Sequence, residues 1–180
     1  MRIVPTDIEG VVIVDIEPRV DERGSFARTF CAETFASLGL DARVVQTNLS
    51  HNHRAGTLRG LHLQRPPHGE AKLVRCSRGR VFDVAADVRR DSPTRGRWVG
   101  VVLAADTHRA LYVPPGCAHG YLTLEDDSVV VYQVSAAYVP GAEVGVRWDE
   151  PRLGISWPAP VEVISVKDAG WPYLPAGAWP

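Results

Sequence analysis

The 180-residue chain is long enough for one domain with a hydrophobic core of its own and too short for two full domains. Its 20 basic and 21 acidic residues give a formal net charge of −1. No overall positive field would therefore draw nucleic acid or an acidic membrane surface to the chain, and we expect neither as a partner. An anionic ligand would have to be met by local arginines.

The amino terminus and the cysteines indicate the compartment. The first residues lack a basic region followed by an apolar one, and the longest apolar run, near 99–105, is far too short to span a bilayer. Cys31, Cys76 and Cys117 are odd in number and have no C-x-x-C spacing, which suits small packing roles rather than disulfides. We therefore expect a cytoplasmic protein.

Short β-branched and aromatic segments, separated by Gly, Pro or Asp, run through most of the chain. Strands are predicted, in chain order, at 10–16, 25–30, 43–49, 57–63, 71–76, 80–84, 98–103, 109–113, 120–124 and 128–138. A short helix is predicted only at 32–38, where Phe35 and Leu38 share a face and Gly39 can end it. This pattern predicts an all-β fold, a closed β-sandwich or jelly roll.

The segment from about 151 to 180 is rich in Pro and Trp. It resembles an arm lying on a surface more than a second domain, so we expect a single domain over 1–180 with this arm attached. Its tryptophans, Trp157, Trp171 and Trp179, must bury against something, and a partner subunit is one candidate.

Two histidines are candidates for a shared site. His62 lies within the strand predicted at 57–63, and His119 follows a Pro-Pro-Gly turn that would deliver it to the next strand. A lone strand histidine is more often structural, but two beside glycines in a barrel-like fold favour a common pocket. Simple strand alternation places Arg59 on the face opposite His62, unless a bulge intervenes.

The same histidines raise the possibility of a metal. PPGCAH has the P-x-G-x-x-H form of one cupin motif, and His62 could open the other, whose metal-binding version is H-x-H followed by Glu. Here the second position is Gln64, and Glu70 lies late. An amide in place of an imidazole weakens a transition-metal site, so we expect no metal; a metal-dependent cupin oxygenase remains an alternative.

Lysine is rare in this chain. Of the twenty basic residues only Lys72 and Lys167 are lysine, and the other eighteen are arginine. A lysine kept against this background indicates a need for a compact ammonium group, although chance retention explains it as well.

An ordered series of motifs now identifies a resemblance. It comprises DERGSF, QTNLS, TLRGLHLQ, EAKLVRC, FDVAADVRRDSPTRGRWVG, YVPPGCAHGY, VYQVSAAYVPGAEVGVRWDEPRLGISWP and SVKD, spanning roughly 10–172. The series resembles the dTDP-4-dehydrorhamnose 3,5-epimerase family. The resemblance implies a cupin-type jelly roll, a homodimer, no metal or other cofactor, and a nucleotide-linked 4-keto-6-deoxy sugar as substrate.

The resemblance also implies roles for individual residues. His62 matches the base that removes the proton beside the ketone, and Asp168 matches its carboxylate partner. Tyr132 matches the acid that serves the opposite face of the sugar. Lys72 would stabilise the enolate at the C4 oxygen, in agreement with the lysine argument.

Further positions match those with which the family holds its substrate: Arg23, Gln46, Asn48, Arg59, His119, Glu143 and Lys167, with Tyr138 as the aromatic residue that stacks on the nucleotide base. Arg28 is also a candidate substrate-binding residue, although it departs from the family pattern, which has an acidic residue there near the nucleotide and sugar. Cys117 and Tyr121 replace phenylalanines, and His68 is an additional histidine.

The sequence therefore favours an epimerase that inverts C3 and C5 of dTDP-4-dehydro-6-deoxy-D-glucose through an enolate. A monofunctional 3- or 5-epimerase on a related sugar is the nearest alternative, and a ketoisomerase is a more distant one. A cupin-like module that binds nucleotide sugars without turnover is an alternative of another class. It predicts binding that is indifferent to loss of His62 or Tyr132. The nucleotide, the number of inverted carbons and the pathway product stay open.

Overall fold

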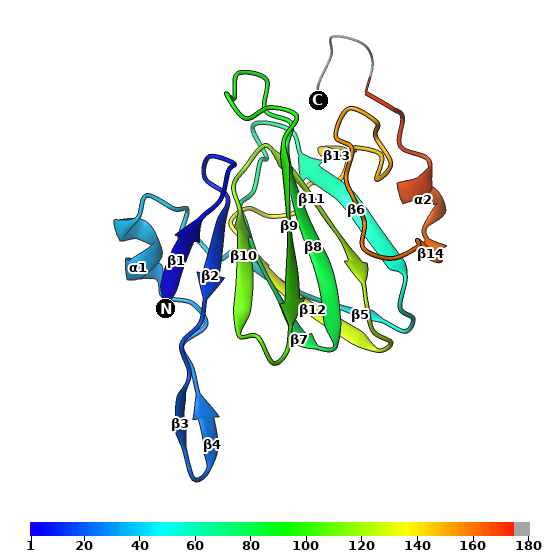
Figure 1. Ribbon diagram of the computed structural model, residues 1–180. Coiled ribbons are helices and arrows are strands. Elements are labelled where there is room, and N and C mark those ends of the chain that lie inside the picture. The colour runs from blue at the N-terminus through cyan, green and yellow to red at the C-terminus, as the bar shows by residue number, and fades with distance from the viewer. Residues whose placement is uncertain (175–180) are drawn as a thin grey trace.

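Two antiparallel β-sheets packed face to face form the body of the molecule (Figure 1), as seen in a computed structural model that describes residues 1–174. The first sheet contains, in spatial order, β1 (Arg2–Pro5), β2 (Val12–Asp15), β10 (Arg109–Val113), β7 (Lys72–Arg78), β12 (Ser128–Val134) and β5 (Gln46–Asn52). The second sheet contains β13 (Glu143–Gly145), β6 (Thr57–Gln64), β11 (Cys117–Thr123), β8 (Arg80–Asp87) and β9 (Trp98–Ala104), with β14 (Val163–Ile164) parallel to β6.

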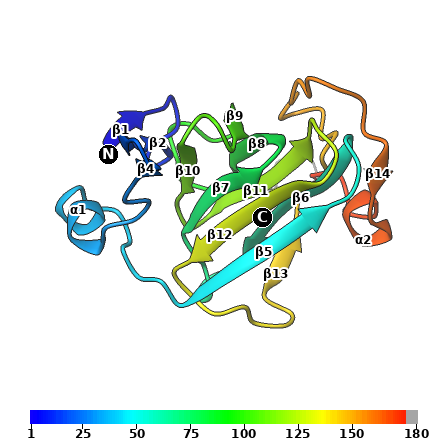
Figure 2. The same cartoon turned by 90° about the horizontal axis from the view of Figure 1, so that it is seen from below.

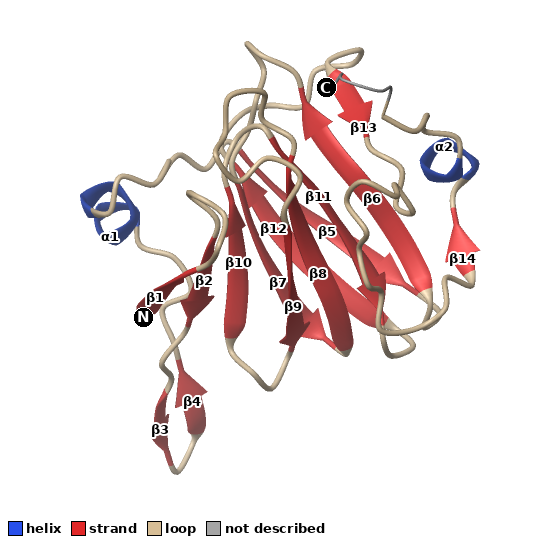
Figure 3. Ribbon diagram, turned by 45° about the horizontal axis from the view of Figure 1, so that its top comes forward, coloured by secondary structure: helices blue, strands red, loops and turns tan. Residues whose placement is uncertain are grey.

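The remaining elements lie at the edges of this sandwich (Figure 3). They are the hairpin of β3 (Arg19–Asp21) and β4 (Gly24–Phe26), the helix α1 (Ala32–Ser37) and the helix α2 (Val166–Ala169). Among residues 1–174 the hairpin strands pair only with each other; they project from the body, and all six of their residues are exposed. Neither helix within residues 1–174 is long and apolar enough to cross a membrane.

The predicted all-β sandwich is confirmed. Each predicted strand overlaps an observed one, although the strand predicted at 128–138 ends at Val134. The sequence missed β1, β3, β13 and β14, which are too short to carry a clear alternating pattern. The short helix predicted at 32–38 is confirmed as α1, and a few short helices accord with the predicted fold class. The position of α2 was not predicted; Ser165 caps this helix by accepting a hydrogen bond from the Asp168 amide at 3.0 Å.

Alternation along the strands builds three apolar layers. Between the sheets, Val74 of β7 and Leu111 of β10 pack against Leu103 of β9. On the outer face of the first sheet, Phe35 of α1 is fully buried in a second cluster. On the outer face of the second sheet, Leu153 contributes to a third cluster. Burial of these side chains supplies the main stabilisation of the sandwich.

The carboxyl-terminal segment packs on its own chain as far as residue 174. Trp157 lies against Phe82, with ring centroids 6.1 Å apart, and the Leu174 amide donates to Glu150 at 2.7 Å. Trp171 lies over Gly145, where an added Cβ would meet the indole at 2.0 Å. These two tryptophans therefore contact their own chain; Trp179 is outside the described residues.

A bulge in β6 changes the pattern expected from simple alternation. His62 pairs with His119 and Arg59 pairs with Tyr121, so that Gly60 and Leu61 together face Gly120. Arg59 and His62 consequently both point between the sheets. The bulge that the sequence analysis left open is therefore present, and simple alternation does not separate them. Gly60 permits the bulge, because its φ is +123° and an added Cβ would lie 2.6 Å from the Gly120 Cα.

A buried carboxylate at the end of β8 leads to a prediction about pH and stability. Asp87 accepts hydrogen bonds from Arg89, Ser92 and Thr94, the last at 2.6 Å. Burial alone would raise the pKa of Asp87, but these donors lower it to about 2 from 3.8. Because the folded pKa is depressed, this stabilisation is complete above about pH 4 and is lost as the pH falls toward 2.

We therefore expect Asp87→Asn to lower the free energy of unfolding at pH 7 by on the order of 2 kcal/mol. The difference in unfolding free energy between this variant and wild type should become smaller between pH 4 and pH 2, as measured by urea unfolding. Asp91→Asn, at a nearby exposed position, is the matched control and should have the wild-type free energy of unfolding at each pH. An equal difference in unfolding free energy between Asp87→Asn and wild type at pH 4 and at pH 2 would contradict this role of Asp87.

Candidate active site

A cavity of about 620 Å³ lies between the two sheets, where their inward-facing positions change from apolar to polar. Figure 2 shows β5 and β12 of the first sheet near β6 and β11 of the second at this end of the sandwich. The cavity is lined from both sheets and from α2, by Leu49, Ser50, Thr57, Leu58, Arg59, His62, Lys72, His119, Tyr121, Tyr132, Val163, Ile164, Ser165, Lys167 and Asp168.

A smaller cavity of about 120 Å³ adjoins the first, because His62, Lys72 and Tyr132 line both. It adds four further residues from the sequence prediction: Gln46, Asn48, Tyr138 and Glu143. The structure thus brings together around one space all of the predicted site residues except Arg23 and Arg28.

His62 is held by a carboxylate from a distant part of the chain. Its Nε2 lies 2.7 Å from Oδ1 of Asp168, whose other oxygen accepts the Gly60 amide hydrogen at 3.1 Å. The cap on α2 fixes Asp168, and the bulge in β6 presents the Gly60 amide. Two local features of the backbone therefore set the position of this pair.

The charge of Asp168 determines which nitrogen of His62 carries a hydrogen toward it. Burial raises the pKa of Asp168, but the hydrogen bond and charge of His62 and the Gly60 amide bring it below its usual value. Asp168 is therefore a carboxylate at neutral pH and can only accept, so Nε2 of His62 carries the hydrogen. In the neutral imidazole Nδ1 then has a free lone pair, and its nearest carboxylate is Glu143 at 3.9 Å. This arrangement suits a base acting through Nδ1.

Lys72 enters the cavity from the first sheet. Its Nζ lies 3.2 Å from Glu70 and donates to the His62 carbonyl oxygen, also at 3.2 Å. On β7, Lys72 shares the inward face with Val74 and Cys76, so it marks the point where the apolar core ends. A cation at this position can stabilise an oxygen that gains negative charge.

Tyr132 faces the cavity from β12, in the sheet opposite His62. Burial raises the pKa of Tyr132 above its usual value and outweighs the opposing charge of Arg59. The phenol is therefore protonated at neutral pH and is available as an acid.

Sequence reasoning missed the residues that position Arg59. The Arg59 Nε donates to Asn52 at 2.8 Å, and the Tyr121 hydroxyl donates to Ser50 at 2.9 Å. Asn48, Ser50 and Asn52 share the inward face of β5. Polar side chains at three alternate positions of one strand are a sequence signal that could have identified β5 as a polar wall of the cavity.

The other predicted substrate positions form ion pairs and hydrogen bonds at the edge of the smaller cavity. Lys167 forms an ion pair with Glu143, and this bond raises the pKa of Lys167. The Tyr138 amide donates to Gln46 at 3.0 Å. Lys167 also lies over the Trp171 ring, whose centroid is 6.5 Å from that of His62.

The residues of the cupin metal motif are engaged with protein partners. His119 Nε2 lies 2.8 Å from Asp83, and Gln64 donates to Glu70 at 2.9 Å. Because His62 is hydrogen-bonded to Asp168, the imidazoles of His62 and His119 are each paired with a carboxylate. We assign no metal to this set.

Arg23 and Arg28 do not line either cavity. Arg23 lies at the tip of the β3–β4 hairpin, where it pairs with Asp21 and its side chain is 82% exposed. Arg28 lines a separate surface hollow with Phe26 and Cys31. Within one chain, therefore, the structure does not bring these two residues to the predicted site.

Known proteins match this chain over nearly its full length. The family model described as dTDP-4-dehydrorhamnose 3,5-epimerase matches residues 5–176. A protein of that name from Methanothermobacter thermautotrophicus is 44% identical over 174 residues, which cover 94% of this chain and 92% of that protein. A Streptomyces niveus protein named dTDP-4-dehydrorhamnose 3-epimerase is 40% identical, over 93% of this chain and 81% of its own.

Solved structures agree. A dTDP-4-dehydrorhamnose 3,5-epimerase from Elizabethkingia anophelis superposes with a TM-score of 0.93 at 38% identity, covering 96% of each chain. A Bacillus anthracis enzyme of the same name, with TDP and pyrophosphate bound, superposes with a TM-score of 0.92 at 36% identity, over 96% of this chain and 99% of that one. The likeness extends through both sheets and the segments that bound the cavity, so the chain belongs to the dTDP-4-dehydrorhamnose 3,5-epimerase family.

Proposed function

We propose that this protein is an isomerase that inverts C3 and C5 of dTDP-4-dehydro-6-deoxy-D-glucose to give dTDP-4-dehydro-L-rhamnose. One observation carries the proposal: His62 and Tyr132 line one cavity from opposite sheets, with Lys72 beside both. A sugar ring between them would meet a base on one face and an acid on the other. The names of the matching family and relatives support the same reaction.

The chemistry needs only groups that this chain supplies. The C4 ketone acidifies the hydrogens at C3 and C5, so Nδ1 of His62 can remove one as a proton and leave an enolate. Asp168 stabilises the resulting imidazolium, and Lys72 stabilises the charge on the C4 oxygen. Tyr132 then gives its proton to the opposite face of the carbon, which inverts it. The tyrosinate regains a proton from solvent, and the imidazolium loses its proton to solvent.

The cavity walls suit the rest of the substrate. Arg59 presents a guanidinium to the larger cavity, where it could bind a diphosphate through paired hydrogen bonds. His119 and Lys167 lie on the same walls, whereas Gln46, Asn48, Tyr138 and Glu143 border the smaller cavity. The Bacillus anthracis relative has TDP bound, which supports a thymidine nucleotide here.

The exposed hairpin supports a homodimer. Val20 and Phe26 of this hairpin are 77% and 75% exposed, and apolar side chains on a projecting arm favour burial against another chain. Arg23 and Arg28 could then join a substrate site only if the arm of one subunit reached the cavity of its partner. We therefore propose that each site takes both arginines from the second subunit.

Mixed dimers test this arrangement. Arg23→Ala alone should lower kcat/KM roughly tenfold or more, because a charged hydrogen bond to substrate is lost. A purified heterodimer of one Arg23→Ala subunit and one His62→Ala subunit should contain one intact site and show half the wild-type activity. If the arm served its own subunit, this heterodimer would show only half the activity of Arg23→Ala. A monomeric protein in light scattering would also contradict the proposal.

Product analysis tests the function itself. Purified protein should convert dTDP-4-dehydro-6-deoxy-D-glucose to the doubly inverted sugar, identified by proton NMR, and should leave the GDP-linked sugar unchanged. Inversion at C3 or C5 alone would select the monofunctional reading, which the Streptomyces niveus relative's name keeps open. Tight binding without any product, unaffected by loss of His62 or Tyr132, would contradict catalysis and indicate a binding module.

A further inference from the structure

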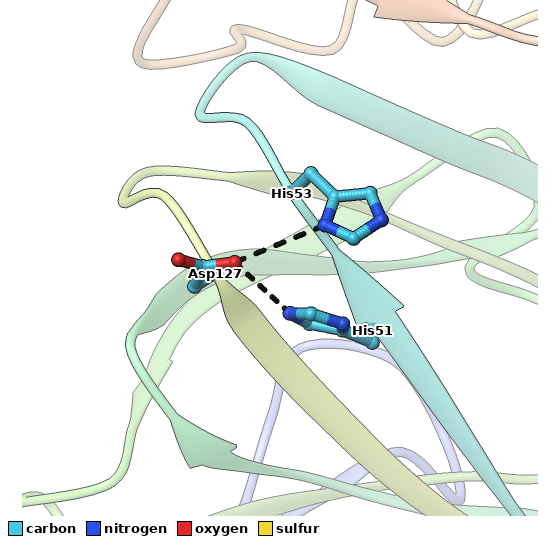
Figure 4. Close-up of side chains that lie close together, drawn as sticks. All are labelled: His51, His53 and Asp127. Carbon is cyan, nitrogen blue, oxygen red and sulfur yellow. Dashed lines mark hydrogen bonds and ion pairs between the residues drawn. The ribbon is translucent and has the colours of Figure 1, made fainter.

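Two histidines and an aspartate gather on the surface where β5 ends and β12 begins (Figure 4). His51 Nε2 lies 3.1 Å from Oδ1 of Asp127, and His53 Nδ1 lies 3.9 Å from the same oxygen. The three possible ligand atoms all lie within 4.8 Å of one another. None of these residues lines the cavity that contains His62.

The backbone places the three side chains together. His51 and His53 are two residues apart and therefore project from the same side of the extended chain, whereas Asn52 between them is buried and points inward to Arg59. Pairing of β5 with β12 sets Asn52 opposite Ser128, so Asp127 comes alongside the histidines. Its amide donates to the His53 carbonyl oxygen at 3.3 Å, and its φ of 51° turns the chain there.

A neighbouring contact holds the same corner. Asp126 accepts a hydrogen bond from the Ala55 amide at 2.7 Å. The two loops that carry the ligands are thus tied to each other on both sides of the histidines. The carboxylate is consequently held near both rings by the fold, and a metal would need only small side-chain rotations to be bound.

The ligand chemistry suits a transition metal. His51 meets Asp127 at hydrogen-bond distance, and His53 turns Nδ1 toward the same oxygen at 3.9 Å, with the His51 and His53 ring centroids 4.6 Å apart. Two imidazole nitrogens and one carboxylate oxygen form a common zinc ligand set. Bonds of about 2.0–2.1 Å would place tetrahedral ligand atoms roughly 3.3 Å apart. The two histidine nitrogens lie 3.1 and 3.9 Å from the Asp127 oxygen, so binding would draw His53 inward.

We propose that His51, His53 and Asp127 form a surface site for a divalent transition metal, with Zn²⁺ the metal that fits best. The site is separate from the epimerase cavity, and the proposal does not depend on the proposed reaction. Water would complete the coordination, because the side chains of His53 and Asp127 are 82% and 50% exposed. Such an open site should bind and release its metal readily.

Titration of tag-free full-length protein with Zn²⁺ tests the site. Calorimetry should give one Zn²⁺ per chain, and Co²⁺ in its place should show the visible absorption of a site with nitrogen ligands. His53→Gln and Asp127→Asn should each weaken binding more than the roughly 10–100-fold typical for loss of an outer-shell partner. Asparagine tolerates the left-handed backbone at 127, so the second variant keeps the turn.

Two further variants separate this site from other histidines. His68→Gln changes an exposed histidine elsewhere, and His62→Ala removes the cavity histidine; both should bind Zn²⁺ as wild type does. His53→Gln should also retain wild-type epimerase activity without metal. Absence of stoichiometric Zn²⁺ binding, or equal loss of binding in His68→Gln or His62→Ala, would overturn the proposal.

Discussion

Replacement of His62 by alanine should lower kcat roughly 10²- to 10⁴-fold, the usual contribution of a general base. It should also stop solvent exchange at both C3 and C5, because His62 is the proposed base for both carbons, whereas His119 of the same cavity is bonded to Asp83. Its side chain is 25% exposed at the cavity wall rather than packed in a core, so the fold should tolerate the change. Steady-state kinetics and proton NMR in deuterated buffer measure the two effects.

The matched control for this variant is His68→Ala, because His68 is exposed and lines neither cavity. Added imidazole should restore part of the exchange in His62→Ala, since truncation opens a space beside Asp168. Unchanged exchange in His62→Ala would show that another group removes the proton, and the assignment of the base would then be wrong.

Replacement of Tyr132 by phenylalanine should separate proton removal from inversion. The variant keeps the ring and loses only the hydroxyl, so substrate binding and deprotonation by His62 should persist. Inverted product should fall by roughly 10²- to 10⁴-fold, because no acid then serves the opposite face of the carbon. NMR should show deuterium entering the substrate while its configuration is retained.

Tyr121→Phe is the control for this second variant. Tyr121 lines the same cavity, but its hydroxyl is engaged with Ser50, so its loss should affect binding more than inversion. Loss of both exchange and inversion in Tyr132→Phe would contradict a role limited to proton delivery. Normal inversion in that variant would show that the acid is another group.

The sequence was sufficient for the architecture because each sheet has one apolar inner face and one covered outer face. Inward positions such as Val74 and Leu111 alternate with outward ones, and this period is visible in the residues themselves. Part of the cavity was also predicted, from two strand histidines, His62 and His119, each near a glycine, and from Lys72, one of only two lysines. Asp168 was predicted only from the ordered series of family motifs, because no local pattern connects it to His62.

Other features depend on contacts that a linear pattern does not contain. The bulge at Gly60 results from close approach to Gly120, and it reverses the facing of Arg59. The helix α2 has only four residues, which is too short for a helical period to be visible in the sequence, and it begins at the cap formed by Ser165. Asn52 holds Arg59 across the sandwich, a contact that requires knowledge of which strands face each other.

The central claim is that C3 and C5 of a single sugar are both inverted by loss of a proton to the protein and gain of a solvent-derived proton. Wild-type protein acting on dTDP-4-dehydro-6-deoxy-D-glucose in deuterated buffer tests it most directly, with NMR and mass spectrometry of the product. The account predicts one solvent deuteron at each of C3 and C5, both in inverted configuration. Product that retains the original hydrogen at either inverted carbon would contradict it.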